Sequence, residues 1–146
     1  MFPMSQVSEI GRADEGAPVA ELPLLGCRIA AGFPSPADDH LERRIDLNAH
    51  LIPRPGATFF LRVEGDSMSG AGILDGDLIA VDRSAKARDG AIVVAALRGE
   101  LTVKRLARVG HGWELRPDNP RYAAVPVPEE GLAVWGVVVA VVRRTT

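Results

Sequence analysis

The sequence predicts a mainly β domain of short twisted strands, preceded by an extended N-terminal arm. Apolar residues make up 47% of the chain, so a substantial core can be buried. Val, Ala, Gly and Pro are plentiful whereas aromatic residues are only 5%, a bias typical of strands joined by many turns. A length of 146 residues suits one domain.

The arm is predicted for residues 1–31. Residues 11–18 are small and polar and show no sustained hydrophobic period. The apolar residues among 22–25 indicate a piece that docks onto another surface. The arm is too short to form a helix-turn-helix domain with a core of its own.

The segment after the arm is predicted to be extended and rich in turns. Residues 32–36 read Gly-Phe-Pro-Ser-Pro, and a residue that precedes proline avoids the helical region. The first half of residues 38–48 is also predicted to be extended. Asp46 then caps a short helix that runs through Leu51 and stops at Pro53.

From Thr58 onward the pattern predicts successive strands. Asp75-Gly76 and Asp89-Gly90 mark turns between them, and Arg98-Gly99 predicts a tight hairpin. The last strand, residues 132–142, is apolar on both faces and is therefore predicted to be central in the sheet. The predicted strands are residues 58–64, 77–82, 91–97, 100–106, 113–116, 122–127 and 132–142.

Composition also narrows the class of function. A net charge of −2 leaves no basic footprint, so direct sequence-specific binding of nucleic acid is not expected. The longest apolar run, residues 132–142, falls short of the roughly 20 residues that span a membrane. No signal peptide is expected from the opening residues, and the lone Cys27 cannot form an internal disulfide. These features predict a cytoplasmic protein with no membrane partner, no cofactor and no metal site.

Ser67, within the sequence Gly-Asp-Ser-Met at residues 65–68, is the candidate nucleophile. A serine hydroxyl is not ionised at pH 7 and needs an adjacent base. The three histidines, His40, His50 and His111, each stand in a polar or turn-like setting, which favours solvated surface residues over a catalytic role.

Lysine is the alternative base, because burial in an apolar site favours its neutral form. Lys86 lies in a charged turn and is predicted to be solvated. Strand alternation puts Lys104 on one face with Thr102 and Leu106, where it could be half-enclosed. The strand alone also fits an exposed edge lysine, and by itself favours that simpler interpretation.

The ordered motifs resemble the LexA/UmuD family of self-cleaving serine peptidases. The Gly-Asp-Ser-Met segment is followed by Gly-Ile-x-x-Gly-Asp at residues 72–77, and Thr-Val-Lys-Arg-Leu at residues 102–106 places Lys104 37 residues after Ser67 (104 − 67). Residues 117–122 resemble the family's Pro-x-Asn-x-x-[Tyr/Phe] loop and residues 134–138 its closing strand, so the resemblance covers residues 32 to about 143.

The resemblance implies a compact LexA C-terminal-like β fold and specific roles. Ser67 would be the nucleophile and Lys104 its general base. The backbone N–H groups of Ser67 and Asp66 would hold the oxyanion. Gly65 suits this turn because it has no Cβ, and Met68 is expected to pack in the core. No catalytic role is expected for the Asp66 side chain.

The resemblance also implies that the substrate lies in the chain itself. The family cuts a small residue–Gly bond upstream of the serine, which here is Ala31-Gly32. The following Gly-Phe-Pro-Ser-Pro sequence resembles the UmuD branch. Cleavage would divide the chain into an arm, residues 1–31, and a Ser-Lys peptidase-like domain, residues 32–146. Cys27 has no catalytic role in this scheme, and a cut at Gly26-Cys27 fits no pattern.

For the UmuD-like branch, RecA filaments on single-stranded DNA would stimulate self-cleavage after DNA damage. The trimmed homodimer would then serve a UmuC-like catalytic subunit as an error-prone translesion polymerase. A repressor role is disfavoured because only 31 residues precede the cut, and a signal peptidase would need a membrane anchor. The alternatives are a non-catalytic adaptor of the same fold that binds a polymerase or RecA, and an antirepressor relative.

Overall fold

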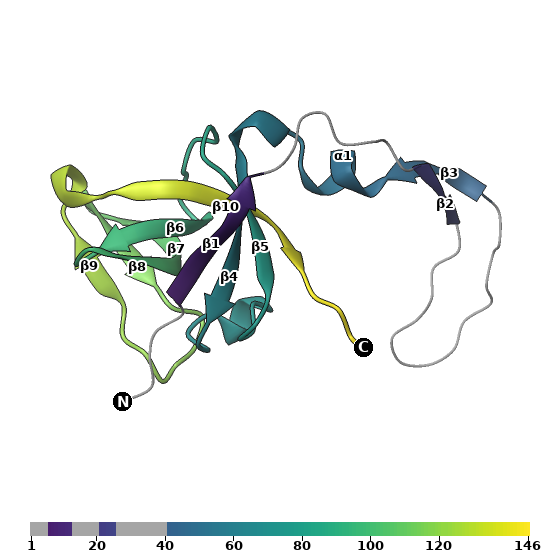
Figure 1. The fold of residues 1–146 in the computed structure, drawn as a ribbon. Helices are drawn as coiled ribbons and strands as arrows, with labels where there is room; N and C mark the ends of the chain where they lie inside the picture. Colours follow the sequence, from purple (N-terminus) through teal and green to yellow (C-terminus); the bar gives the residue numbers. More distant parts are fainter. Residues whose placement is uncertain (1–5, 13–20, 26–40) are drawn as a thin grey trace. The chain divides into compact units, whose positions relative to one another are not determined.

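The computed structural model describes residues 6–12, 21–25 and 41–146 (Figure 1). The chain divides into two compact units. The larger unit combines Met1–Glu15 with Arg54–Thr146, and the smaller is Gly16–Pro53. The predicted division at residues 31 and 32 refers to cleavage and stays a prediction.

An eight-stranded antiparallel sheet forms the larger unit, and it confirms the predicted mainly β fold class. The strand order is β1-β4-β5-β10-β6-β7-β8-β9. Short 3-10 turns occur at Pro55–Ala57, Ser69–Ala71 and Glu129–Gly131. The strands are β1 (Gln6–Arg12), β4 (Thr58–Glu64), β5 (Leu78–Asp82), β6 (Ile92–Leu97), β7 (Glu100–Val109), β8 (Gly112–Arg116), β9 (Val125–Val127) and β10 (Val134–Val142).

Strand β1 closes this sheet on itself. It pairs antiparallel with β4 from Gln6 opposite Glu64 to Arg12 opposite Phe59. Gln6 is also the partner of Thr102 on β7. The six strands β1-β4-β5-β10-β6-β7 thus form a barrel-like ring, and β8 and β9 extend from it. Figure 1 shows β1 crossing beside β4.

The core consists of two apolar clusters on opposite faces of the sheet. Alternation along β6 shows this, because Val94 belongs to one cluster while Val93 and Ala95 belong to the other. Leu61, Val63, Met68, Ile73, Ile79, Val81, Val94 and Val103 form the first cluster, and Val93, Ala95, Leu106 and Leu115 form the second.

The hairpin between β6 and β7 follows its local sequence. Leu97 is paired with Glu100, which leaves Arg98 and Gly99 as the two-residue loop. Both take positive φ, 54° for Arg98 and 80° for Gly99, as a primed hairpin turn requires. This turn fixes the register of β7 and hence the face on which Lys104 lies.

Strand β10 lies between β5 and β6, as predicted for a strand apolar on both faces (Figure 1). Its pairing with β6 shifts register between Val134 and Gly136. At Gly136 the packing leaves no room for a side chain, because a Cβ there would meet Val81 Cγ1 at 2.6 Å and the Asp82 carbonyl oxygen at 3.2 Å.

We therefore expect Gly136→Ala to lower the free energy of unfolding by about 1–3 kcal/mol through overpacking. Urea denaturation would measure this change. Val139→Ala, at a side chain on the same strand that is 39% exposed, is the control and should change stability by about 0.5 kcal/mol or less. Equal effects of the two substitutions would contradict the overpacking argument.

The smaller unit contains β2 (Glu21–Leu25), which pairs antiparallel with β3 (Leu41–Asp46), and the helix α1 (Leu47–Leu51). Asp46 caps α1 as predicted, since its Oδ1 accepts the Asn48 N–H at 3.1 Å. The sequence did not predict β1 or β2. Both lie within residues 1–31, lack a sustained alternating pattern, and are defined by pairing with residues distant in sequence.

Candidate active site

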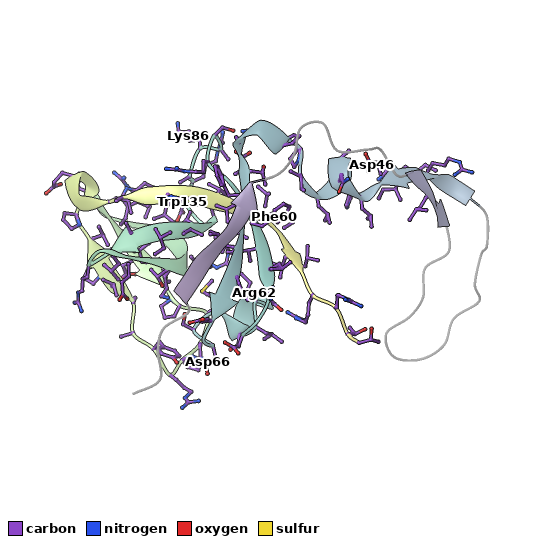
Figure 2. The ribbon with its side chains drawn as sticks, viewed as in Figure 1. Asp46, Phe60, Arg62, Asp66, Lys86 and Trp135 are labelled. Carbon is purple, nitrogen blue, oxygen red and sulfur yellow. The ribbon has the colours of Figure 1, made fainter. Side chains whose placement is uncertain are left out.

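The turn after β4 carries Ser67. Gly65 takes φ of 93°, a conformation that favours glycine, and this confirms the reason for expecting glycine there. The Gly65 N–H donates to Asp75 Oδ1 at 2.8 Å, which holds the start of the turn. Ser67 is fully buried, and Met68 packs in the core as predicted. Figure 2 shows Asp66 just beyond the end of β4.

Lys104 lies on β7 between β6 and β8 and has no exposed surface. Thr102, Lys104 and Leu106 alternate along β7 and share one face, as the strand period predicts, and all three are buried. The simpler interpretation of Lys104 as an exposed edge lysine is therefore wrong.

The two side chains meet although 37 residues separate them. Lys104 Nζ lies 3.0 Å from Ser67 Oγ. It also lies 2.8 Å from Thr102 Oγ1 and 2.9 Å from the Val103 carbonyl oxygen. Sequence reasoning did not identify these last two contacts, although Thr102 was placed on the correct face.

Burial lowers the pKa of Lys104 from 10.5 to about 8, because the charged ammonium loses hydration inside the fold. The three oxygen atoms around Nζ belong to uncharged groups, so these contacts supply no carboxylate to offset that effect. At pH 7 about one lysine in ten is then neutral, which is enough for a general base near neutral pH.

The geometry orients the lone pair of a neutral Lys104. The Val103 carbonyl can only accept, so it takes one N–H, and the Thr102 hydroxyl can accept the second. The lone pair is left to face Ser67 Oγ and can accept its proton. The arrangement is therefore chemically suited to activating a serine nucleophile.

Residues 117–122 form a loop, the bracing loop, that is hydrogen-bonded both to the turn region that carries Ser67 and to β7, the strand that carries Lys104. Asn119 Nδ2 donates to the Asp66 carbonyl oxygen at 2.9 Å, and the Gly70 N–H donates to the Asp118 carbonyl oxygen at 2.7 Å. Arg105, which follows Lys104 on β7, donates from Nη2 to Asp118 Oδ2 at 2.8 Å.

Asp66 also contacts the bracing loop through its side chain. The Tyr122 hydroxyl donates a short hydrogen bond to Asp66 Oδ1, and this contact raises the pKa of Tyr122 above its ordinary value. The carboxylate of Asp66 therefore links the serine turn to the bracing loop, and the absence of a catalytic role for it stays a prediction. Tyr122 itself lies in a turn, outside the strand predicted from residue 122.

The competing candidate bases lie on the surface. His50, His111 and Lys86 are all exposed. His40, the bond Ala31-Gly32 and Cys27 lie outside the described residues. Within residues 6–12, 21–25 and 41–146, no cluster of His, Cys, Asp or Glu is arranged to hold a metal ion.

Comparison with known proteins shows the family. Residues 23–139 match the family described as Peptidase S24-like. The chain belongs to the peptidase S24-like family. Membership confirms the resemblance to the LexA/UmuD family and supports a serine peptidase of that type, and the mainly β sheet agrees with the LexA C-terminal-like fold.

Relatives within the S24-like family include short proteins and repressors. Protein ImpA of Escherichia coli is 47% identical over 124 residues, which cover 84% of each chain. Protein SamA of Salmonella typhimurium is 48% identical over 134 residues, 91% of this chain and 94% of SamA. The LexA repressor of Delftia acidovorans is 47% identical over 126 residues, 85% of this chain but 55% of the repressor.

No helix among the described residues of this S24-like chain is both long and apolar enough to cross a membrane.

Proposed function

We propose that the chain is a UmuD-like serine peptidase that cuts itself between Ala31 and Gly32. Ser67 is the nucleophile and Lys104 the general base. The observation that carries the proposal is the buried 3.0 Å contact between Lys104 Nζ and Ser67 Oγ, made by a lysine whose pKa is lowered to about 8.

In the proposed reaction, Lys104 Nζ takes the proton of Ser67 Oγ as the oxygen attacks the Ala31 carbonyl carbon. The backbone N–H groups of Ser67 and Asp66 stabilise the resulting oxyanion. The Ala31–Gly32 C–N bond then breaks, and the Lys104 ammonium returns its proton to the departing Gly32 nitrogen. Water, deprotonated by Lys104, hydrolyses the ester between Ala31 and Ser67 and restores the free serine.

The chemistry of the Ala31–Gly32 bond supports its choice as the substrate. Neither residue carries a large side chain, so the backbone can enter a narrow cleft, and Gly32 can adopt dihedral angles closed to other residues. Because substrate and nucleophile share one chain, the effective concentration of the bond at Ser67 is high.

The proposed cellular role is that of a UmuD-like protein of SOS mutagenesis. RecA filaments on single-stranded DNA stimulate the cut, and the trimmed chain, residues 32–146, forms a homodimer that assists a UmuC-like translesion polymerase. The share of each relative's length that aligns with this chain supports this role. The aligned region spans 84% of ImpA and 94% of SamA but only 55% of a LexA repressor.

The position of the cut is tested by substitution of Gly32. Purified protein incubated at pH 9, or with RecA filaments, should yield two fragments whose masses correspond to residues 1–31 and 32–146. Gly32→Trp should slow this cleavage at least about 100-fold, because a bulky side chain displaces the bond from the nucleophile. Intact-mass spectrometry measures both outcomes.

Gly26→Trp is the matched control, since it makes the same change at another glycine of the arm and should leave cleavage at Gly32 intact. Normal processing of Gly32→Trp would show that the bond lies elsewhere. If the wild-type chain stays intact with active RecA, the non-catalytic adaptor becomes the better explanation.

A further inference from the structure

We propose that Asn119 is a positioning residue that fixes the orientation of the peptide unit between Asp66 and Ser67. Through this peptide it aims the Ser67 N–H at the place where the oxyanion forms. The inference rests on the proposed function, because it concerns a donor in the proposed reaction.

The orientation of the Asn119 side chain is set by two backbone contacts. Its Oδ1 accepts the Arg121 N–H at 3.0 Å, a contact that the amide nitrogen cannot make. The Nδ2 group therefore points at the Asp66 carbonyl oxygen, to which it donates at 2.9 Å. The Arg121 N–H thus fixes the amide oxygen of Asn119, and the amide nitrogen is left to donate to Asp66.

The hydrogen bond from Asn119 to the Asp66 carbonyl oxygen also fixes the direction of the neighbouring Ser67 N–H. A peptide unit is planar, and in its trans form the C=O and the following N–H point in opposite directions. A donor that fixes the Asp66 carbonyl therefore also fixes the Ser67 N–H. The Asp66 carbonyl accepts one further backbone N–H, from Ser69 at 3.2 Å, so Asn119 supplies the shorter of these two hydrogen bonds.

Further hydrogen bonds of the bracing loop hold the residue next to Asn119 in place. Asp118 accepts from Gly70 through its backbone and from Arg105 through its carboxylate. Its approach to the turn is so close that a Cβ on Gly70 would clash with the Asp118 carbonyl oxygen. Because Arg105 adjoins Lys104, the loop is hydrogen-bonded both to the turn region that follows β4 and carries Ser67 and to the strand that carries Lys104.

The test measures self-cleavage of the full chain across pH. Asn119→Leu keeps the branched shape but has no donor, and Asn119→Asp keeps the acceptor for Arg121 while also losing the donor to Asp66. We expect both to lower the maximal rate at high pH by roughly 10- to 100-fold. For Asn119→Leu, the pH of half-maximal rate should stay near 8, the pKa of Lys104.

Pro120→Ala is the control, since it changes an exposed neighbour in the same loop and removes no N–H group. It should leave the maximal rate within about twofold of wild type. An unchanged maximal rate in Asn119→Leu would overturn the proposal. A midpoint shifted towards 10.5 would also overturn it, because the loop would then act through the burial of Lys104.

A second measurement does not depend on cleavage. The amide resonance of Ser67 in a nitrogen-15 NMR spectrum should shift or broaden in Asn119→Leu and stay in place in Pro120→Ala. An unchanged Ser67 resonance refutes the positioning role. A wild-type chain that never cuts itself, with the resonance shifted as expected, refutes the proposed function but leaves the positioning of this peptide established.

Discussion

Lys104→Met should stop self-cleavage and at the same time stabilise the folded chain at pH 7. Methionine fills a similar space but cannot accept the Ser67 proton, so the rate should fall by at least about 10³-fold. At pH 7 the shift of the lysine pKa from 10.5 to about 8 corresponds to a burial cost of about 3 kcal/mol, which methionine removes. Loss of the three hydrogen bonds, at about 0.5 kcal/mol or more each, offsets at least half of this gain and leaves at most about 1.5 kcal/mol.

The stability gain has a defined pH window. Below pH 8 the lysine is protonated in both the folded and the unfolded chain, so the full cost of burying its charge is present. Between pH 8 and 10.5 the unfolded chain binds more protons, and the wild type gains stability as the pH rises. The advantage of Lys104→Met should therefore shrink through this window and reverse above it, where only the loss of the three hydrogen-bond partners remains.

Gel time courses and urea denaturation measure the two effects. Lys86→Met is the matched control, because Lys86 is exposed and its loss should change neither the rate nor the stability appreciably. Ser67→Ala should also stop cleavage while leaving the buried lysine in place, so it should show no comparable gain. Cleavage by Lys104→Met at the wild-type rate would exclude Lys104 as the base.

The rate of wild-type self-cleavage should rise about tenfold per pH unit below pH 8 and level off above about pH 9. This follows because only the neutral form of Lys104 accepts a proton, and its pKa is about 8. First-order rate constants measured from pH 6 to 10 without RecA give the profile. A midpoint near 10.5 would show that the lysine is hydrated when the chain reacts, and a flat profile would show that no group of this pKa limits the rate.

Local sequence predicted much of the sheet and singled out Ser67, one member of the candidate pair. The bounds of β4, the Asp46 cap and the Arg98-Gly99 turn each depend on a few adjacent residues, and all three were predicted correctly. Alternation put Lys104 on the correct face, but its complete burial depends on packing by other strands. The family resemblance, rather than the strand pattern, pointed to that lysine as the base.

The features that sequence did not predict depend on contacts between distant residues. The hydrogen bond from Asn119 to Asp66 joins residues 53 positions apart in the sequence, and β1 is defined by pairing with β4 residues more than 45 positions away. Tyr122 has a residue type typical of strands, yet it lies in a turn where its hydroxyl meets Asp66. Single-residue preferences carry no information about such partners.

The position of β1 gives the proposed cut a thermodynamic consequence. This strand completes the sheet against β4 and β7, yet its covalent connection to β4 passes through residues 31 and 32. While the chain is whole, the tether keeps β1 at an effective concentration on the order of millimolar. Once the bond is broken, β1 becomes a separate peptide ligand that dissociates on dilution, and its departure would leave the backbone donors and acceptors of one side of β4 open to another strand.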